Sequence, residues 1–244
     1  MHMPMPSDSD TRHPQPNRSD DTSVVPRLER WLPPLLSVVA GMVDVIGFLS
    51  LGNLFTAHIT GNLVVIAALT VRGGPVNLAQ VLAIPVFILA VAVVWLLAKA
   101  SGRRGPGLAR PLLLIQFLLL TCVLIFSIVT EPSAHPHGLM AGIAAMIAVS
   151  AMACQFALLR LALPGAPSTA VMTGNLTNAV LSLLDTLPRT QSLTAGATQR
   201  LRASLHLLIA FFGGCVAAAA AVSLLGEWAW SFPVALAGVA VALP

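Results

Sequence analysis

Charged residues are scarce in this chain of 244 residues: only 9% are Asp, Glu, Lys or Arg, whereas a soluble globular domain carries about 25%. Tyrosine is absent, and hydrophobic residues make up 57% of the chain, with a mean hydropathy of +0.87. So few polar groups exclude an ordinary water-soluble domain. The composition predicts an integral membrane protein.

The familiar signatures of catalysis are also missing. The three cysteines, Cys122, Cys154 and Cys215, lie in apolar segments without metal-site spacing or a disulfide framework. The sequence contains no phosphate-binding loop, nucleophile elbow, HExxH or CxxC. We therefore expect no enzyme, no catalytic residue, no cofactor and no metal site. Twelve of the thirteen basic residues are Arg, nearly all in the tail or loops, which indicates membrane orientation rather than nucleic-acid binding.

The chain does contain eight apolar segments, which follow a polar, Pro-rich stretch over residues 1–30. We expect that stretch to be a disordered N-terminal tail and residues 31–244 to form a single membrane domain of α-helices. A full span needs about 20 apolar residues, and the second, sixth and last segments are the shortest. The segments cover residues 32–52, 54–71, 78–98, 111–129, 138–159, 169–184, 203–225 and 230–244.

A polar motif occurs twice in these apolar surroundings. TAHITGNL occupies residues 56–63 and TAVMTGNL occupies residues 169–176, with six of the eight positions identical. Each copy lies in one of the short segments. This repetition predicts two internal repeats, over about residues 31–130 and 138–244.

The distribution of Lys and Arg favours one of two topologies. If all eight segments cross the membrane from a cytoplasmic N-terminus, the cytoplasmic side holds eight cationic residues and the other side five. If the two motif segments are re-entrant, the cytoplasmic side holds twelve and Arg72 alone lies outside. Because cytoplasmic loops carry the excess of Lys and Arg, six full spans with two re-entrant segments are favoured. The halves are then inverted, as in many transporters. Eight crossings, which make the repeat parallel, stay open because residues 54–71 are nearly long enough to span.

Polar side chains at membrane depth are the candidate site. Buried Thr and Asn groups must find partners, so the two motif copies either line a shared polar site or fasten helices together. Asp44 is the only carboxylate deep in an apolar segment, where a charge costs at least about 2.5 kcal/mol and tends to be functional. It aligns with about Gln155 in the second half, and with His58 it forms a candidate proton relay. The candidate substrate-binding residues are Asp44, Thr60, Gly61, Asn62, Gln155, Thr173, Gly174 and Asn175.

Four stretches carry a family resemblance: GMVDVIGFL, FTAHITGN, AMACQFALLRL and TAVMTGNLTN. They resemble the YoaK-like family of bacterial inner-membrane proteins, which is classed as a domain of unknown function, and the resemblance covers about residues 32–243. The chain departs from it at Ala153–Phe156, where the family tends to have Gly-x-Gln-Asn. The resemblance implies a multi-pass protein of the bacterial inner membrane, but it implies no substrate. The cytoplasmic N-terminus is predicted from the distribution of Lys and Arg.

Two functions remain open. The first is a small-solute or proton-coupled transporter, or a channel, with its polar site at the repeat interface. Its partners are the lipid bilayer, an unidentified small solute and a second copy of the chain. The alternative is a non-transporting membrane scaffold or a subunit of a membrane assembly, in which the same polar groups only lock helices together.

Overall fold

The fold is built from α-helices, and no β-strand occurs among the residues described by this computed structural model, which are 21–73, 77–169, 171–185 and 195–243. The all-α prediction is therefore confirmed for these residues. Most of the predicted tail lies outside them, although the first helix already begins at Asp21. The helices are α1 (Asp21–Ser50), α2 (Ile59–Arg72), α3 (Leu78–Ala100), α4 (Ala109–Thr130), α5 (Leu139–Ala162), α6 (Met172–Leu184), α7 (Ala195–Leu225) and α8 (Ser231–Ala242).

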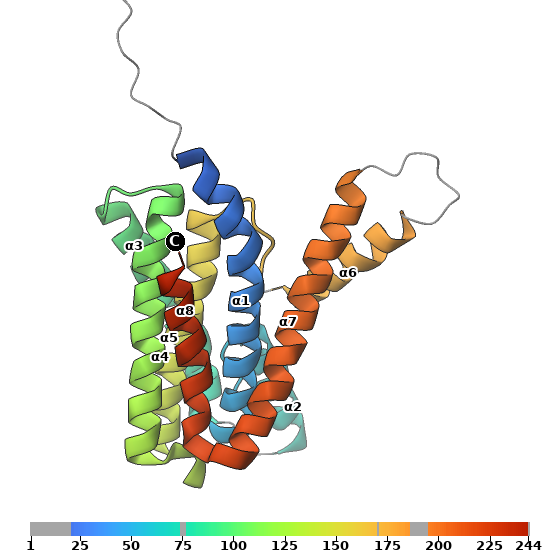
Figure 1. Cartoon of the computed structure of the whole chain (residues 1–244). Coiled ribbons are helices and arrows are strands. Elements are labelled where there is room, and N and C mark those ends of the chain that lie inside the picture. The colour runs from blue at the N-terminus through green and yellow to red at the C-terminus, as the bar shows by residue number, and fades with distance from the viewer. Residues whose placement is uncertain (1–20, 74–76, 170, 186–194, 244) are drawn as a thin grey trace, which may run out of the picture.

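Among the described residues, five stretches are long and apolar enough to cross a membrane. The last of them contains both α7 and α8, which Figure 1 shows running in opposite directions on either side of the short turn Gly226–Trp230. α8 has only 12 residues. The five stretches are Arg30–Ser50, Leu78–Ala100, Gly105–Thr130, Leu139–Ala162 and Thr198–Ala242.

The two motif segments form half-length helices. α2 has 14 residues and α6 has 13, so each is about 20 Å long against a bilayer core of about 30 Å. The chain between α1 and α2 leaves the helical conformation at Gly52 and Asn53, whose φ angles are +74° and +58°. α2 ends at Gly73, which adopts the left-handed conformation typical of a helix C-terminus. Residues 54–58, which were predicted to begin an apolar helix, are therefore non-helical.

α1 and α5 are the buried helices of the bundle, whereas α3 lies at its surface. The apolar windows of α1 and α5 are each 67% buried, and that of α3 is 17% buried. α5 can be enclosed on most sides because it is rich in alanine, whose small side chain lets neighbouring helices approach closely.

α1 and α7 make the closest helix crossing. A Cβ at Gly41 would overlap the backbone oxygen of Phe211, and a Cβ at Gly214 would overlap the backbone oxygen of Val38. The Cys215 thiol also donates a hydrogen bond to the Gly41 carbonyl. The two helices therefore touch backbone to backbone at these glycines.

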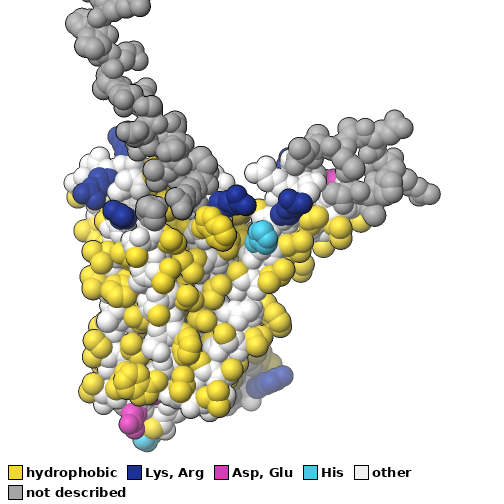
Figure 2. All heavy atoms as spheres, viewed as in Figure 1, with side chains coloured by type: hydrophobic (Ala, Val, Ile, Leu, Met, Phe, Trp, Pro, Cys, Tyr) yellow, Lys and Arg dark blue, Asp and Glu magenta, His cyan; other side chains and the backbone are white. Residues whose placement is uncertain are grey.

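Charged side chains gather at the two ends of the molecule, and hydrophobic side chains cover the flank between them. Figure 2 shows most of the visible Lys and Arg side chains at the upper end, with a smaller cationic group near the lower end. The same view shows acidic and His side chains at the lower tip. This distribution fits a lipid bilayer around the middle of the bundle.

Candidate functional site

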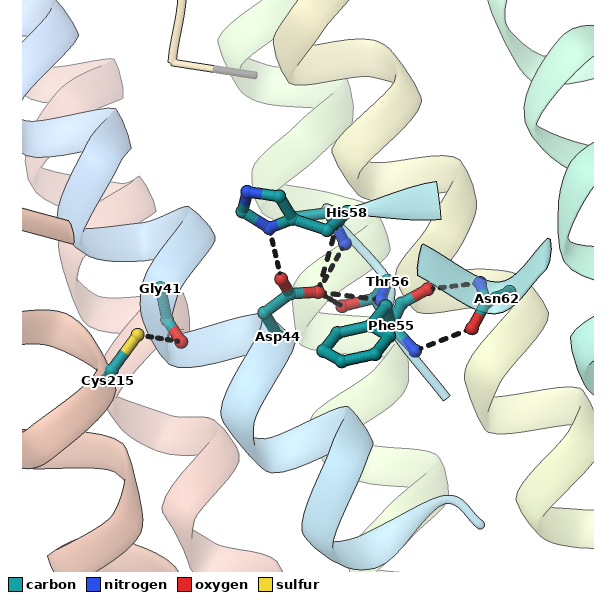
Figure 3. A network of polar contacts seen from close by, with 8 residues as sticks. Gly41, Asp44, Phe55, Thr56, His58, Asn62 and Cys215 are labelled. Carbon is teal, nitrogen blue, oxygen red and sulfur yellow. Dashed lines mark hydrogen bonds and ion pairs between the residues drawn. The ribbon is translucent and has the colours of Figure 1, made fainter. Parts of the chain in front are cut away.

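Asp44 is the centre of a polar network at the C-terminal part of α1 (Figure 3). It is only 4% exposed. Its Oδ1 accepts hydrogen bonds from three successive backbone N–H groups, those of Thr56 (2.8 Å), Ala57 (2.7 Å) and His58 (3.3 Å). The Thr56 hydroxyl donates a longer one at 3.4 Å. Successive N–H groups around one oxygen form an anion-binding nest, so Asp44 fixes the loop against α1 and sets where α2 begins.

His58 completes this network and directly precedes α2. Its Nδ1 lies 2.5 Å from Oδ2 of Asp44, and its ring meets the ring of Phe211 on α7 edge-on, with centroids 5.1 Å apart. The side chain is 32% exposed. Figure 3 shows that the second ring nitrogen, Nε2, points away from the carboxylate. The two residues predicted as a proton relay are thus in contact through Nδ1 of His58.

The two motif asparagines perform the same structural task. Nδ2 of Asn62 donates to the backbone oxygen of Phe55 (2.8 Å), and Oδ1 of Asn62 accepts from the backbone N–H of Phe55 (2.9 Å). Nδ2 of Asn175 donates to the backbone oxygen of Ser168 (2.8 Å). Each asparagine therefore ties the first turn of its half-length helix to the loop seven residues earlier.

The motif glycines allow those loops to lie against the helices. A Cβ at Gly61 would lie 2.9 Å from Cδ2 of Phe55, and one at Gly174 would lie 3.1 Å from Cγ1 of Val171. Thr60 and Thr173, by contrast, are exposed, and their hydroxyls make no hydrogen bond within the part of the chain that the structure describes. Of the repeated Thr-Gly-Asn, the asparagine and glycine are explained by local packing.

Gln155 lies in a different polar contact. Its Oε1 accepts a hydrogen bond from Nε2 of Gln116 on α4 (2.7 Å), and its Nε2 donates to the backbone oxygen of Leu36 on α1 (2.9 Å). Gln155 therefore joins three helices and does not contact Asp44 or its partners. It lies two positions from Ala157, the residue that corresponds to Asp44 when the two motif copies are superimposed in sequence.

The eight predicted residues do not form one cluster. α2 packs on α3, and α6 packs on α7. Among the described residues, no hydrogen bond joins one motif copy to the other. What sequence reasoning missed is Thr56, whose backbone and side chain both bind Asp44. The available signal was its place as the first residue of the repeated octapeptide.

These observations define a class: a multi-pass α-helical membrane protein with a buried carboxylate paired with a partly exposed histidine at the start of a half-length helix. The chain belongs to the family described as "Protein of unknown function (DUF1275)", whose model matches residues 32–243. The predicted family resemblance is therefore confirmed.

One relative is the UPF0700 transmembrane protein YoaK of Bacillus subtilis (strain 168), which is 36% identical over 88 residues. That alignment covers 35% of this chain and 39% of the relative, so the chain aligns with well under half of that protein's length. No solved structure matches the chain.

Proposed function

We propose that this chain is a proton-coupled transporter of a small solute in the bacterial inner membrane. The observation that carries the proposal is the Asp44–His58 pair, held within the bundle of apolar helices at the start of a half-length helix. Ionisable side chains at such positions are costly and are characteristic of ion and proton pathways. We further propose two inverted repeats, with six full spans, two re-entrant helices and a cytoplasmic N-terminus.

The pattern of helix packing supports the presence of two structural repeats, whichever way the second is oriented. If α1 to α4 correspond to α5 to α8, every well-packed helix pair has its counterpart. The pair α1·α7 corresponds to α3·α5, α2·α3 to α6·α7, and α4·α5 to α1·α8, while α4·α8 and α1·α5 map onto themselves. A pseudo-twofold axis through the bundle explains this correspondence.

The course of the chain supports the re-entrant topology. In Figure 1, α2 lies near the lower end, where α1 finishes, and α6 rises toward the upper end, where α5 finishes. Each half-length helix thus returns to the end from which its loop entered. With this topology the cationic residues gather at one end, as the positive-inside rule requires of the cytoplasmic side, and Arg72 at the end of α2 is the exception.

The chemistry of the pair supports proton coupling. With Nδ1 donating to the carboxylate, neutral His58 and ionised Asp44 carry one negative charge together. Proton uptake at Nε2 makes an imidazolium beside a carboxylate, so the pair becomes neutral overall. A change from charged to neutral lowers the cost of moving the site through a low-dielectric region. That is the property a coupling site needs.

The scaffold alternative is favoured by a different observation. The Asp44 oxygens are surrounded by donors of the chain itself, so the carboxylate already has the partners that a purely structural latch requires. The two functions predict different results for a variant that removes the charge of Asp44 but keeps most of its hydrogen bonds. Such a variant should lose activity in a transporter and should remain functional as a structural latch.

A transport assay decides between them. Purified protein is reconstituted into liposomes that enclose a pH-sensitive dye, and short-chain carboxylates, amino acids and sugars are added in turn. We expect one class to cause proton uptake in the wild type and in His206→Gln, a control at an exposed His on α7. Uptake should be lost in Asp44→Asn and His58→Gln. Undiminished uptake in a folded Asp44→Asn protein contradicts proton coupling through this pair, and inactivity of the wild type with every class favours the scaffold.

Topology is tested by labelling single cysteines in a background without Cys122, Cys154 and Cys215. Cysteines at Arg30 and Arg104 should react from the cytoplasmic side and a cysteine at Arg72 from the opposite side. Cysteines at Pro164 and Asp185, which flank the α6 segment, should share one side. Opposite sides for this last pair exclude a re-entrant α6.

A further inference from the structure

In the first half of the chain, a carboxylate group is bound at the start of the half-length helix, and this carboxylate is the side chain of Asp44. Three N–H groups and the Thr56 hydroxyl surround the Asp44 carboxylate just ahead of α2. A helix start is a suitable place for a negative charge, because its first N–H groups are unpaired and its dipole is positive there. We call this loop together with the start of α2 the first frame, and the loop before α6 together with the start of α6 the second frame. Asp44 thus indicates that the first frame binds a carboxylate.

The second half repeats the frame. Val171 precedes α6 as His58 precedes α2, and their backbone angles are similar, with φ −121° and ψ 73° against φ −92° and ψ 61°. The bond from Asn175 to Ser168 spans the same seven residues as the bond from Asn62 to Phe55. The loop before α6 is therefore tied to its helix as the loop before α2 is.

The second frame lacks its carboxylate. Asp44 lies twelve residues before Thr56, and the residue twelve before Thr169 is Ala157, which is 7% exposed. The Thr169 hydroxyl is fully buried and has no hydrogen-bond partner, whereas the equivalent hydroxyl of Thr56 donates to Asp44. An unpaired buried hydroxyl costs free energy, so the second frame is complete only when another group accepts from Thr169.

In the sequence register of the two halves, a cation in the second half corresponds to Gly47 in the first. A Cβ at Gly47 would lie 2.8 Å from Cγ2 of Thr56, so this position on α1 faces the motif threonine. The residue at the same distance before Thr169 is Arg160. Its side chain is exposed and, among the described residues, has no acidic partner. Relative to the first frame, the second replaces a carboxylate by a methyl group and a glycine by an arginine.

We propose that the second motif copy binds the carboxylate of a small monocarboxylic acid, held by the Thr169 hydroxyl, the backbone N–H groups of Thr169 and Val171 and the Arg160 guanidinium. The bound carboxylate takes the place that Asp44 takes in the first half. Binding as such needs no transport, but the identification of this acid as the transported solute rests on the proposed function. One bound monoanion and one proton taken up by the Asp44–His58 pair have a net charge of zero, so their joint transport moves no charge across the membrane.

Acetate is the probe for this site. The full-length protein in detergent is heated near neutral pH in sodium acetate or in sodium chloride at equal ionic strength, and the apparent Kd is obtained from the dependence of Tm on acetate. We expect acetate to raise the Tm of the wild type more than chloride does. Thr169→Val and Arg160→Gln should each weaken the apparent Kd about tenfold, since each removes one charge-assisted hydrogen bond. Thr70→Val and Arg72→Gln, at exposed positions of α2, are the matched controls and should keep the wild-type Kd.

Ala157→Asp is the complementary variant. It gives the second frame an internal carboxylate, so its Tm in chloride should rise and no longer depend on acetate. If this variant does not fold, Thr169→Val and Arg160→Gln still decide the matter. The proposal is overturned if acetate stabilises the wild type no more than chloride does, or if the acetate effect is unchanged in both Thr169→Val and Arg160→Gln.

The transport assay separates this inference from the proposed function. Acetate binding that depends on Thr169 and Arg160, without any proton-coupled uptake, leaves the site standing and refutes the transporter. Proton-coupled uptake of another solute that is indifferent to Thr169→Val and Arg160→Gln leaves the transporter standing and refutes the monocarboxylate site.

Discussion

The two half-length helices share the asparagine and glycine that shape the preceding loop, and they differ in the titratable side chains beside that loop. Asn62 and Asn175 make the same kind of bond to the preceding loop, and Gly61 and Gly174 make room for it. Two of the differences between the halves remove a titratable group: Asp44 becomes Ala157, and His58 becomes Val171, whereas the change from Ile59 to Met172 keeps an apolar side chain. Identity between the two motif copies therefore preserves backbone geometry, and the loss of titratable groups marks the candidate functional positions.

Among the variants that test this comparison, Asp44→Ala should cause the largest loss of stability. It removes the acceptor of three N–H groups and leaves His58 without its partner. A buried N–H group left without an acceptor costs about 1–3 kcal/mol, and Asp44→Ala leaves more than one, so we expect a large fall in Tm in detergent. Asp185→Ala, at an exposed carboxylate, should stay within about 0.5 kcal/mol of the wild type. Similar Tm values for the two variants contradict the anchoring role of Asp44.

The asparagines provide the next test, because the comparison requires both to be structural. Asn62→Ala and Asn175→Ala should each lower the free energy of unfolding by about 0.5–1.5 kcal/mol for every hydrogen bond lost, the usual net contribution of such a bond. The loss should be greater for Asn62, which makes two bonds to Phe55. Asn178→Ala, one turn beyond Asn175 and exposed, is the control in the same thermal assay. A neutral Asn175→Ala refutes a shared latch.

The smallest difference in stability is expected between the alanine variants of the two motif glycines. Gly61→Ala drives its new methyl group toward the Phe55 ring, whereas Gly174→Ala meets a methyl group of Val171 at a slightly longer distance. Overpacking costs about 1–3 kcal/mol, and alanine regains about 1 kcal/mol over glycine within a helix. We expect Gly61→Ala to be destabilising and Gly174→Ala to be nearly neutral when their Tm values are compared. The reverse order contradicts the tighter packing of the first copy.

The sequence was informative where the bilayer itself sets the rule. Segment lengths and the short motif segments could be predicted because a span needs about 20 apolar residues. The start of α2 could not, because Leu54 and Ala57 are as apolar as helix residues and equally buried, yet they lie in a loop. The apolar composition of a segment predicts that its residues are shielded from water, but it does not predict their backbone angles.

The site was predictable in the same partial way. The cost of an intramembrane carboxylate was enough to single out Asp44, and the first titratable side chain after it along the chain, His58, is its partner. The position of Gln155 depends on the rotation of α5 about its axis, and a shift of two residues turns a side chain by about 200°. The contact with Gln116 is therefore a tertiary fact that no local pattern contains.

The crossing at Gly41 and Gly214 has a mechanical consequence. It joins α1 to α7 with no side chain between the two backbones, and such a contact has no intermediate layer that can deform. Any relative movement of α1 and α7 therefore has to be a rotation about this point, because sliding would drive the two backbones into each other.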